Sequence, residues 1–244
     1  MTQNIYDTPS FFEGYSQLPR SVAGFDGAPE WPSIRSLIPD LKDRRIADLG
    51  CGFGWFCRWA REQGASEAFG VDVSQNMLSR AKEMTSDPEI HYEQADLEKV
   101  SLAESSYDLV YSSLTFHYLE DLEGLVAKIH RALKPGGWLV FSAEHPVFTA
   151  PSNPGWTQLD DHQNLWPVNQ YLVEGPRITN WLADGVTKQH RTLGTYVNML
   201  LRQGLMLRHL EEWKPTAEQI EQQPELKVEL ERPMFFIAAA QRPS

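Results

Sequence analysis

The stretch that decides the fold is ADLGCGFGW, from Ala47 to Trp55. Glycine occupies three alternate positions in it, Gly50, Gly52 and Gly54, directly after a short apolar run. A glycine-rich turn after a buried strand lets backbone come close to a ligand, because glycine has no Cβ to hold the ligand away. The sequence therefore predicts a ligand site at this turn and leaves open which ligand binds there.

Two common phosphate-binding turns match this stretch poorly. The dinucleotide fingerprint is GxGxxG, and counting from Gly50 its third glycine falls on Trp55. This mismatch disfavours a nicotinamide or flavin cofactor without excluding it. A nucleotide-binding P-loop ends in GK followed by Ser or Thr, and no such ending follows Gly54.

Acidic residues end the first three expected strands, at Asp48, Asp72 and Asp96. Asp72 follows Gly52 by 20 residues, which suits an acid that accepts both ribose hydroxyls of an adenosine. Three acids would repel a pyrophosphate and attract a ligand with an ammonium and a sulfonium, such as S-adenosylmethionine. The alternatives are that Asp48 caps the next helix and that Asp96 is an ordinary loop acid.

Strands and helices alternate between residues 45 and 145. The patterns predict strands at 45–49, 67–74, 89–96, 107–116 and 138–145, helices at 54–64, 74–84 and 121–133, and a turn at 134–137. Ser74 is expected to cap the second of these helices. The alternation predicts an α/β fold with a Rossmann-like, doubly wound, mostly parallel sheet that binds ligands at the carboxyl ends of its strands.

The flanking segments have a different character, and they divide the chain into four parts. An aromatic N-terminal segment (1–40) is expected to form a lid with one helix, before the ligand-binding core (41–145). A segment rich in Pro, Asn and Trp (146–188), with a hairpin expected around Gly175–Pro176, is interpreted as an insert that walls a substrate pocket. A helix and two strands (189–244) are expected to complete the sheet.

Five motifs follow one another along the chain: ADLGCGFG, GVDVS, QADLE, YDLVYSSLTFHYLED and LKPGGWLVFS. In order and spacing they resemble the class I S-adenosylmethionine-dependent methyltransferases, especially the small-molecule branch that includes ubiquinone and menaquinone biosynthesis enzymes. The resemblance covers about residues 44 to 145 and is weaker for LLRQGLMLRHLEEW near the C-terminus. It implies a seven-stranded sheet whose last strand is inserted antiparallel, and an enzyme that leaves S-adenosylhomocysteine as its product.

The resemblance also implies roles for individual residues. The glycine turn would pack against the methionine moiety, Asp48 would orient its amino group, Asp72 would bind the ribose, and Asp96 would meet the adenine amine. The cofactor-binding residues expected in the core are Asp48, Gly50, Cys51, Gly52, Asp72, Val73, Asp96, Leu97, Ser112 and Ser113. No metal ligands are expected.

Residues outside the motifs complete the predicted site. Tyr6 or Tyr15 would lie near the sulfonium, and Arg20 would pair with the methionine carboxylate. Methyl transfer needs a base only when the nucleophile arrives protonated. The candidates at the strand ends are His117, and Glu144 with His145 after the fifth strand, and of these His145 is preferred and His117 is second. For His117 the alternative is a surface loop. The tryptophans of the insert would contact an apolar, aromatic or cationic acceptor, or would simply pack the insert onto the sheet.

Bulk properties limit the partners. The formal net charge of −11 argues against nucleic acid, and no run of apolar residues is long enough to span a membrane. The N-terminal residues lack the pattern of a signal peptide, and there are only two cysteines, so a cytoplasmic protein is expected. We expect a methyltransferase with a small-molecule acceptor, and a homodimer is possible. The alternatives are a non-catalytic adenosyl-binding module or partner subunit, and a nicotinamide-dependent oxidoreductase.

Overall fold

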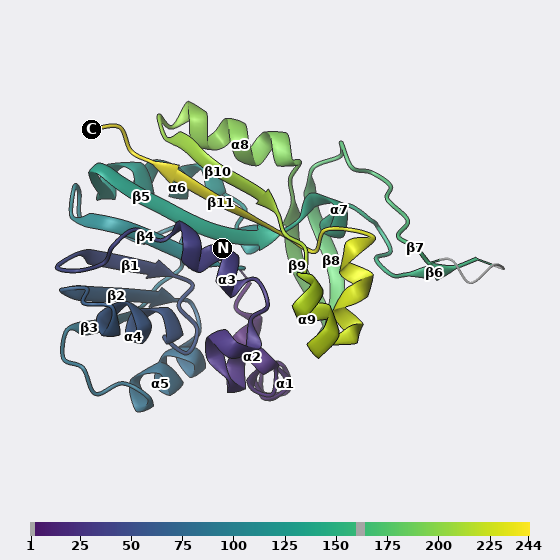
Figure 1. Ribbon diagram of the computed structural model, residues 1–244, viewed down its shortest axis with the longest axis horizontal. Helices are drawn as coiled ribbons and strands as arrows, with labels where there is room; N and C mark the ends of the chain where they lie inside the picture. Colours follow the sequence, from purple (N-terminus) through teal and green to yellow (C-terminus); the bar gives the residue numbers. More distant parts are fainter. Residues whose placement is uncertain (1–2, 160–163) are drawn as a thin grey trace.

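The computed structural model describes residues 3–159 and 164–244, so residues 1–2 of the predicted lid and 160–163 of the predicted insert lie outside the described residues. Seven strands form the main sheet in the order β10-β11-β5-β4-β1-β2-β3 (Figure 1). The strands are β1 (Arg45–Leu49), β2 (Glu67–Asp72), β3 (Ile90–Gln94), β4 (Tyr107–Ser113), β5 (Leu133–Glu144), β10 (Met206–Glu212) and β11 (Phe235–Gln241). Neighbours from β3 through β5 run parallel, whereas β11 runs antiparallel to both β5 and β10. The predicted Rossmann-like sheet with an inserted antiparallel last strand is confirmed.

Helices cover both faces of this sheet (Figure 1). One apolar core contains residues of α3 (Trp31–Leu37), α4 (Trp55–Glu62) and α5 (Gln75–Glu83) packed on β1, β2 and β4. The other core contains residues of α6 (Leu122–Ala132) and α8 (Leu193–Arg202). In each of these helices the apolar residues recur at helical spacing, so one face is buried against the sheet and the opposite face is exposed to solvent. Ser74 caps α5 as expected, because its hydroxyl accepts from Met77 N at 3.1 Å.

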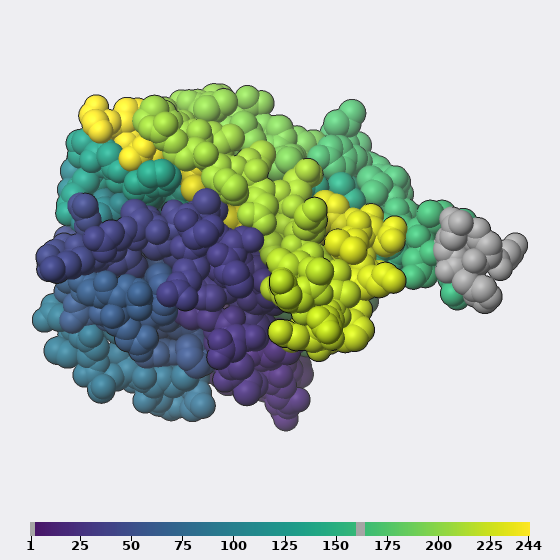
Figure 2. All heavy atoms as spheres, in the orientation of Figure 1, coloured from purple at the N-terminus to yellow at the C-terminus, as the bar shows by residue number. Residues whose placement is uncertain are grey.

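The remaining elements lie beyond the carboxyl ends of the parallel strands. At the N-terminus they are η1 (Ile5–Asp7), α1 (Pro9–Ser16), α2 (Pro19–Val22) and η2 (Gly24–Gly27). After β4 comes η3 (Phe116–Tyr118), and after β5 come α7 (Pro146–Thr149), β6 (Thr157–Gln158), β7 (Asn164–Leu165), β8 (Gly175–Trp181) and β9 (Ala183–His190). Between β10 and β11 lie α9 (Ala217–Gln222) and η4 (Pro224–Leu230). On the face drawn in Figure 2 the purple N-terminal segment lies against the yellow-green α9 region, where Gln219 Nε2 donates to Pro29 O at 2.7 Å.

Two local predictions were wrong. The hairpin is formed by β8 and β9 and turns at Leu182, which has a φ of 59°, whereas Gly175 and Pro176 start the first strand. The KPGG stretch is no free turn but an irregularity within β5, since Leu133 pairs with Tyr107 while Trp138 pairs with Leu109. Proline and glycine marked both positions as irregular in the sequence. The pairing between strands far apart in the sequence then determined whether a turn or a strand formed there. The elements α9 and η4 were not predicted.

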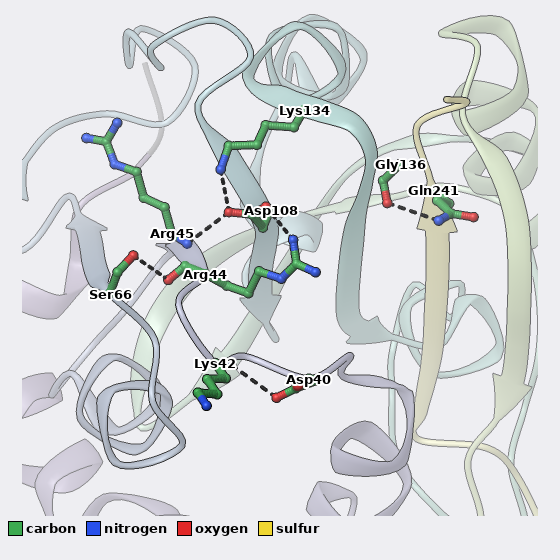
Figure 3. A network of polar contacts seen from close by, with 9 residues as sticks. All are labelled: Asp40, Lys42, Arg44, Arg45, Ser66, Asp108, Lys134, Gly136 and Gln241. Carbon is green, nitrogen blue, oxygen red and sulfur yellow. Dashed lines mark hydrogen bonds and ion pairs between the residues drawn. The ribbon is translucent and has the colours of Figure 1, made fainter.

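The amino ends of the central strands are held by a polar network around Asp108, at the start of β4 (Figure 3). Its carboxylate accepts from Lys134 Nζ at 2.6 Å, from Arg45 N at 3.0 Å and from Arg44 Nη1 at 3.1 Å. Partial burial acts to raise the pKa of Asp108, but these hydrogen bonds and the two cations outweigh burial and hold the pKa below its ordinary value. The network ties β1, β4 and β5 together at the edge opposite the ligand site.

We expect Asp108→Ala to lower the free energy of unfolding by about 1–3 kcal/mol at neutral pH, because three donors lose their acceptor. The depressed pKa means that this contribution is complete above the unfolded-state pKa near 3.9 and is lost as pH falls through the lower folded-state value. Urea unfolding at pH 7 and again in strong acid measures both effects. An unchanged midpoint at pH 7 would contradict the structural role.

Candidate active site

A cavity of about 500 Å³ lies at the carboxyl ends of β1, β2, β4 and β5. Its wall combines the glycine turn with Asp72 on one side and residues of the hairpin, such as Trp181 and Lys188, on the other. The N-terminal segment contributes Tyr6 and Tyr15. Its position is the one expected for a doubly wound sheet, in which the loops at the carboxyl ends separate to leave a crevice.

The three glycines of the turn all have left-handed backbone, with φ of 81° at Gly50, 50° at Gly52 and 70° at Gly54. A Cβ on Gly50 would lie 2.2 Å from Thr115 Oγ1, and one on Gly54 would lie 2.1 Å from Tyr92 Oη. A Cβ on Gly52 would have no atom of the described residues within 4 Å, and Gly52 lines the cavity. Gly50 and Gly54 are therefore required because neighbouring side chains pack against them, whereas Gly52 leaves room for a ligand.

Asp72 connects the end of β2 to the glycine turn. Its Oδ2 accepts from Gly52 N and its Oδ1 from Ser74 N, both at 2.9 Å. Burial raises the pKa of this carboxyl, and the two backbone donors offset only part of that rise. Asp72 and Val73 both line the cavity, so an acid and an apolar side chain stand together where a ribose and a base would lie.

Asp48 is a buried acid at the end of β1, with 2% of its surface exposed. Its Oδ2 accepts from Cys57 Sγ at 3.7 Å. Burial raises the pKa of Asp48 to about 8, with the nearby Asp72 adding to the shift. The alternative that Asp48 caps α4 is wrong, since Gly54 occupies the N-cap position. A cationic ligand group beside Asp48 would favour its ionised form.

Residues 3–7, which we call the strap, cross the cavity and are held at both sides. Gln3 Nε2 donates to Gly185 O at 3.0 Å, and Gln3 Oε1 accepts from Thr187 N at 2.9 Å, so the strap is fastened to β9. Asp7 accepts from Ser74 Oγ at 2.6 Å and from Asn76 N at 3.0 Å, at the start of α5. The sequence analysis expected the N-terminal segment to form a lid with Tyr6 near the sulfonium, but it did not identify Gln3 and Asp7 as the residues that fasten this segment.

Aromatic side chains of the insert surround cations of the protein itself. Lys188 Nζ lies 5.4 Å from the Trp181 ring centroid and 5.7 Å from that of Phe148. The Arg232 guanidinium lies 4.5, 5.2 and 4.3 Å from the ring centroids of Phe148, Trp156 and Trp166. The tryptophans among these rings were predicted to contact an acceptor or to pack the insert onto the sheet. They already hold cations, which leaves their faces less available to a cationic ligand.

A buried ion pair stands in the part of the cavity wall that β5 and β9 form. Glu144, the last residue of β5, accepts from Lys188 Nζ at 2.5 Å through Oε1. His117 Nδ1 accepts from Glu144 N at 3.3 Å, so the imidazole proton lies on Nε2. Burial lowers the pKa of His117 to about 4, although Glu144 opposes the shift, and the ring is neutral at pH 7. All three residues line the cavity.

The structure gathers most of the predicted site residues around this cavity. The predicted residues in its wall are Tyr6, Tyr15, Arg20, Asp48, Gly50, Cys51, Gly52, Asp72, Val73, Leu97, Ser113 and His117. Arg20 is also engaged by Glu30, to which its guanidinium donates at 2.9 and 3.3 Å. Burial in this wall raises the pKa of Tyr6 well above its ordinary value, so the phenol stays neutral.

Three predicted residues lie outside the wall that the described residues form. Asp96 accepts from Glu98 N at 3.1 Å and lies 3.8 Å from Lys99 Nζ, as a turn acid does. Ser112 is buried and donates to Leu49 O at 2.6 Å. His145 accepts from Val147 N through Nδ1 and is paired with Glu212 through Nε2 at 2.9 Å. Both ring nitrogens of His145 are used, so its position does not suit a base for the acceptor.

The site fits a ligand that is a nucleoside with a positive centre. Asp72 offers a carboxylate, Gly52 leaves open space, and Asp48 is a buried acid with no basic partner among the described residues. The fold and this set of groups are those of a Rossmann-like protein that binds a nucleoside, and no glycine-lysine phosphate-binding motif follows the turn.

Comparison with known proteins agrees with this class. The family described as "Methyltransferase domain" matches residues 47–141. The S-adenosylmethionine-dependent methyltransferase from Mesorhizobium loti is 53% identical, covers 90% of this chain and all of its own, and superposes with a TM-score of 0.87. A putative enzyme of the same kind from Listeria monocytogenes is 36% identical, with 89% of this chain and 99% of its own covered and a TM-score of 0.81. This chain belongs to the S-adenosylmethionine-dependent methyltransferases.

A further relative carries a more specific name. The malonyl-[acyl-carrier protein] O-methyltransferase of Enterobacter lignolyticus is 31% identical over 140 residues, which are 57% of this chain and 53% of that protein. The match thus spans about half of the relative's length. Of the part of the chain that is described, no helix is long and apolar enough to cross a membrane.

We expect Gly52→Ala and Gly50→Ala to fail in different ways. Gly52→Ala should cost about 1 kcal/mol of folding free energy for its positive φ and should weaken S-adenosylhomocysteine binding, because the methyl group enters ligand space. Gly50→Ala should lower stability further, because its Cβ meets Thr115. Thermal unfolding and calorimetric titration of both variants separate the effects. Equal losses of stability would contradict the distinction.

We expect Asp48→Asn to stabilise the ligand-free protein at pH 8 and to leave it nearly unchanged at pH 4. The folded-state pKa of about 8 lies above the unfolded value, so the wild-type carboxyl stays protonated when folded while the unfolded chain ionises between those values. Folding is therefore penalised increasingly as pH rises to about 8, by about 1.4 kcal/mol for each pH unit between the two pKa values, and Asn removes the penalty. Chemical denaturation across this pH range tests the sign.

Proposed function

We propose that the enzyme transfers the methyl group of S-adenosylmethionine to a small-molecule acceptor held between the glycine turn and the insert. One observation carries this proposal: a single cavity is lined by Gly52 and Asp72 on one side and by Glu144 and Trp181 on the other. Bound S-adenosylmethionine supplies a methyl group that its sulfonium already activates. The protein then has to align the acceptor with that group and exclude water.

The lining residues suggest how the donor is held. Asp72 would bind the ribose hydroxyls, with Val73 and Leu97 beside the adenine. The turn from Gly50 to Gly52 would contact the methionine moiety, and Asp48 would face its ammonium. Tyr6, which is half-buried and has a neutral phenol, would cover the sulfonium from the strap. The ion pair of Arg20 with Glu30 would orient the guanidinium at the same wall.

The acceptor is proposed from the other half of the cavity. The name of the Enterobacter lignolyticus relative states O-methylation of a malonyl group on an acyl-carrier protein, which makes a carboxylate a candidate acceptor. The strap and the hairpin meet over the cavity, which favours a small acceptor over a folded macromolecule. We place the enzyme in the cytoplasm, in keeping with two free, buried cysteines. The homodimer stays a prediction.

Calorimetric titration tests the donor half of the proposal. S-adenosylhomocysteine is expected to bind and NAD is not, and Asp72→Asn should weaken binding by about 10–100-fold, since each lost charge-assisted hydrogen bond is worth about 1.5–3 kcal/mol. Asp87→Asn is the matched control, because Asp87 pairs with Arg61 outside the cavity wall. Binding of NAD alone would refute the proposal. A protein that binds donor but methylates no amine, hydroxyl or carboxylate would instead be a binding module.

A further inference from the structure

Glu144 has one carboxylate oxygen that the protein leaves without a partner. Its Oε1 accepts from Lys188 Nζ at 2.5 Å, whereas its buried Oε2 has no hydrogen-bond partner among the residues that the structure describes. The side chains of Glu144 and Lys188 are 12% and 5% exposed. Buried polar atoms are nearly always hydrogen-bonded, so an acceptor atom in a cavity wall is a place for a donor on a ligand.

The charges near Glu144 belong to two ion pairs. Glu144 itself is paired with Lys188, and Arg232, whose guanidinium also interacts with Glu144, is paired with Glu229. Lys188 compensates the charge of Glu144, and the rings of Trp181 and Phe148 flank that ammonium. His117 is neutral, and its Nε2 lies 3.8 Å from Glu144 Oε1. A carboxylate ligand would face Oε2 charge against charge, and an ammonium would add a second cation beside Lys188. An uncharged ligand with an O–H group avoids both the repulsion between two carboxylates and the repulsion between two cations.

The proton-accepting alternatives at this wall are less suitable. His117 Nδ1 is already an acceptor for Glu144 N, and its Nε2 carries the proton. Tyr118 and Tyr6 are phenols whose pKa values burial raises. Glu144, whose Oε2 lacks a hydrogen-bond partner among the described residues, is therefore the most suitable proton acceptor that the cavity wall offers at the end of β5.

We propose that Glu144 accepts the proton of the methyl acceptor, and that this acceptor is an uncharged molecule that presents an alcoholic or phenolic hydroxyl to Glu144 Oε2. The inference rests on the proposed function and narrows it to O-methylation of hydroxyl groups. Lys188 is a positioning residue, which holds the carboxylate in place through Oε1. The acceptor differs in class from the malonyl carboxylate of the relatives, which carries no proton at neutral pH.

The step balances without a further reactant. The hydroxyl proton passes to Glu144 Oε2 while a lone pair of the hydroxyl oxygen forms a bond to the methyl carbon of the donor. The carbon–sulfur bond breaks, and its electron pair stays on the sulfur. The products are a methyl ether, S-adenosylhomocysteine and a protonated Glu144, which returns its proton to solvent.

The test uses four probes that share a benzene ring: phenol, benzyl alcohol, benzoate and benzylamine. They are titrated calorimetrically into the full chain saturated with S-adenosylhomocysteine. The hydroxyl probes should bind more tightly than benzoate and benzylamine, and Glu144→Gln should reduce this preference. Glu123→Gln is the matched control, because Glu123 pairs with Arg202 on the surface, away from the cavity.

Methyl transfer is then followed with the hydroxyl probe that binds. Glu144→Gln should lower kcat by about 10²–10⁴-fold, as for loss of a positioned proton acceptor. The loss should be smaller for the matching nitro-substituted probe, whose hydroxyl is more acidic, which a merely structural role would not produce. If Glu144→Gln does not fold, Glu144→Asp is used, because it keeps the charge but moves the carboxylate away from the acceptor. It should lower kcat too, and again less for the nitro-substituted probe.

The outcomes separate the two proposals. Absence of S-adenosylhomocysteine binding to the unmodified chain would overturn the proposed function and this inference with it. Donor binding together with a preference for benzoate or benzylamine would overturn the inference alone. So would a Glu144→Gln variant as active as the unmodified chain. Preference for hydroxyl probes, lost selectively in Glu144→Gln, would support it.

Discussion

The hydrogen bond from Gly52 N to Asp72 Oδ2 is the contact on which the site depends. It fixes the turn after β1 to the end of β2, and it requires left-handed backbone on both sides of Cys51. Neighbouring parallel strands bring these two ends together, so the sheet supplies the position and the glycines supply the conformation. The open space beside Gly52 exists because the turn is held in this way.

The core of the fold was predictable from sequence because its signals are local and repeated. Short apolar strands alternate with amphipathic helices, and acids such as Asp48 and Asp72 mark strand ends. The proposed donor side of the site was inferred from the same signals. Errors arose where long-range pairing decides, as at the turn of the hairpin on Leu182 and the irregularity in β5 before Trp138.

The acceptor side was less predictable because it is assembled from residues far apart in sequence. Glu144 and Lys188 are separated by 44 positions, and only the tertiary structure shows that they pair. His145, one position away, was chosen instead, since histidine has the more suitable intrinsic pKa. In the structure, alternation along the end of β5 places Glu144 in the cavity wall and leaves His145 to cap α7.

The strap links two parts of the cavity wall that lie far apart in the sequence. Through Gln3 it is bonded to β9, which carries Lys188, and through Asp7 to the start of α5, which follows Asp72 and Val73. Both ends are hydrogen-bonded, so β9 and the start of α5 cannot move apart over the cavity unless the bonds of Gln3 or those of Asp7 are broken first.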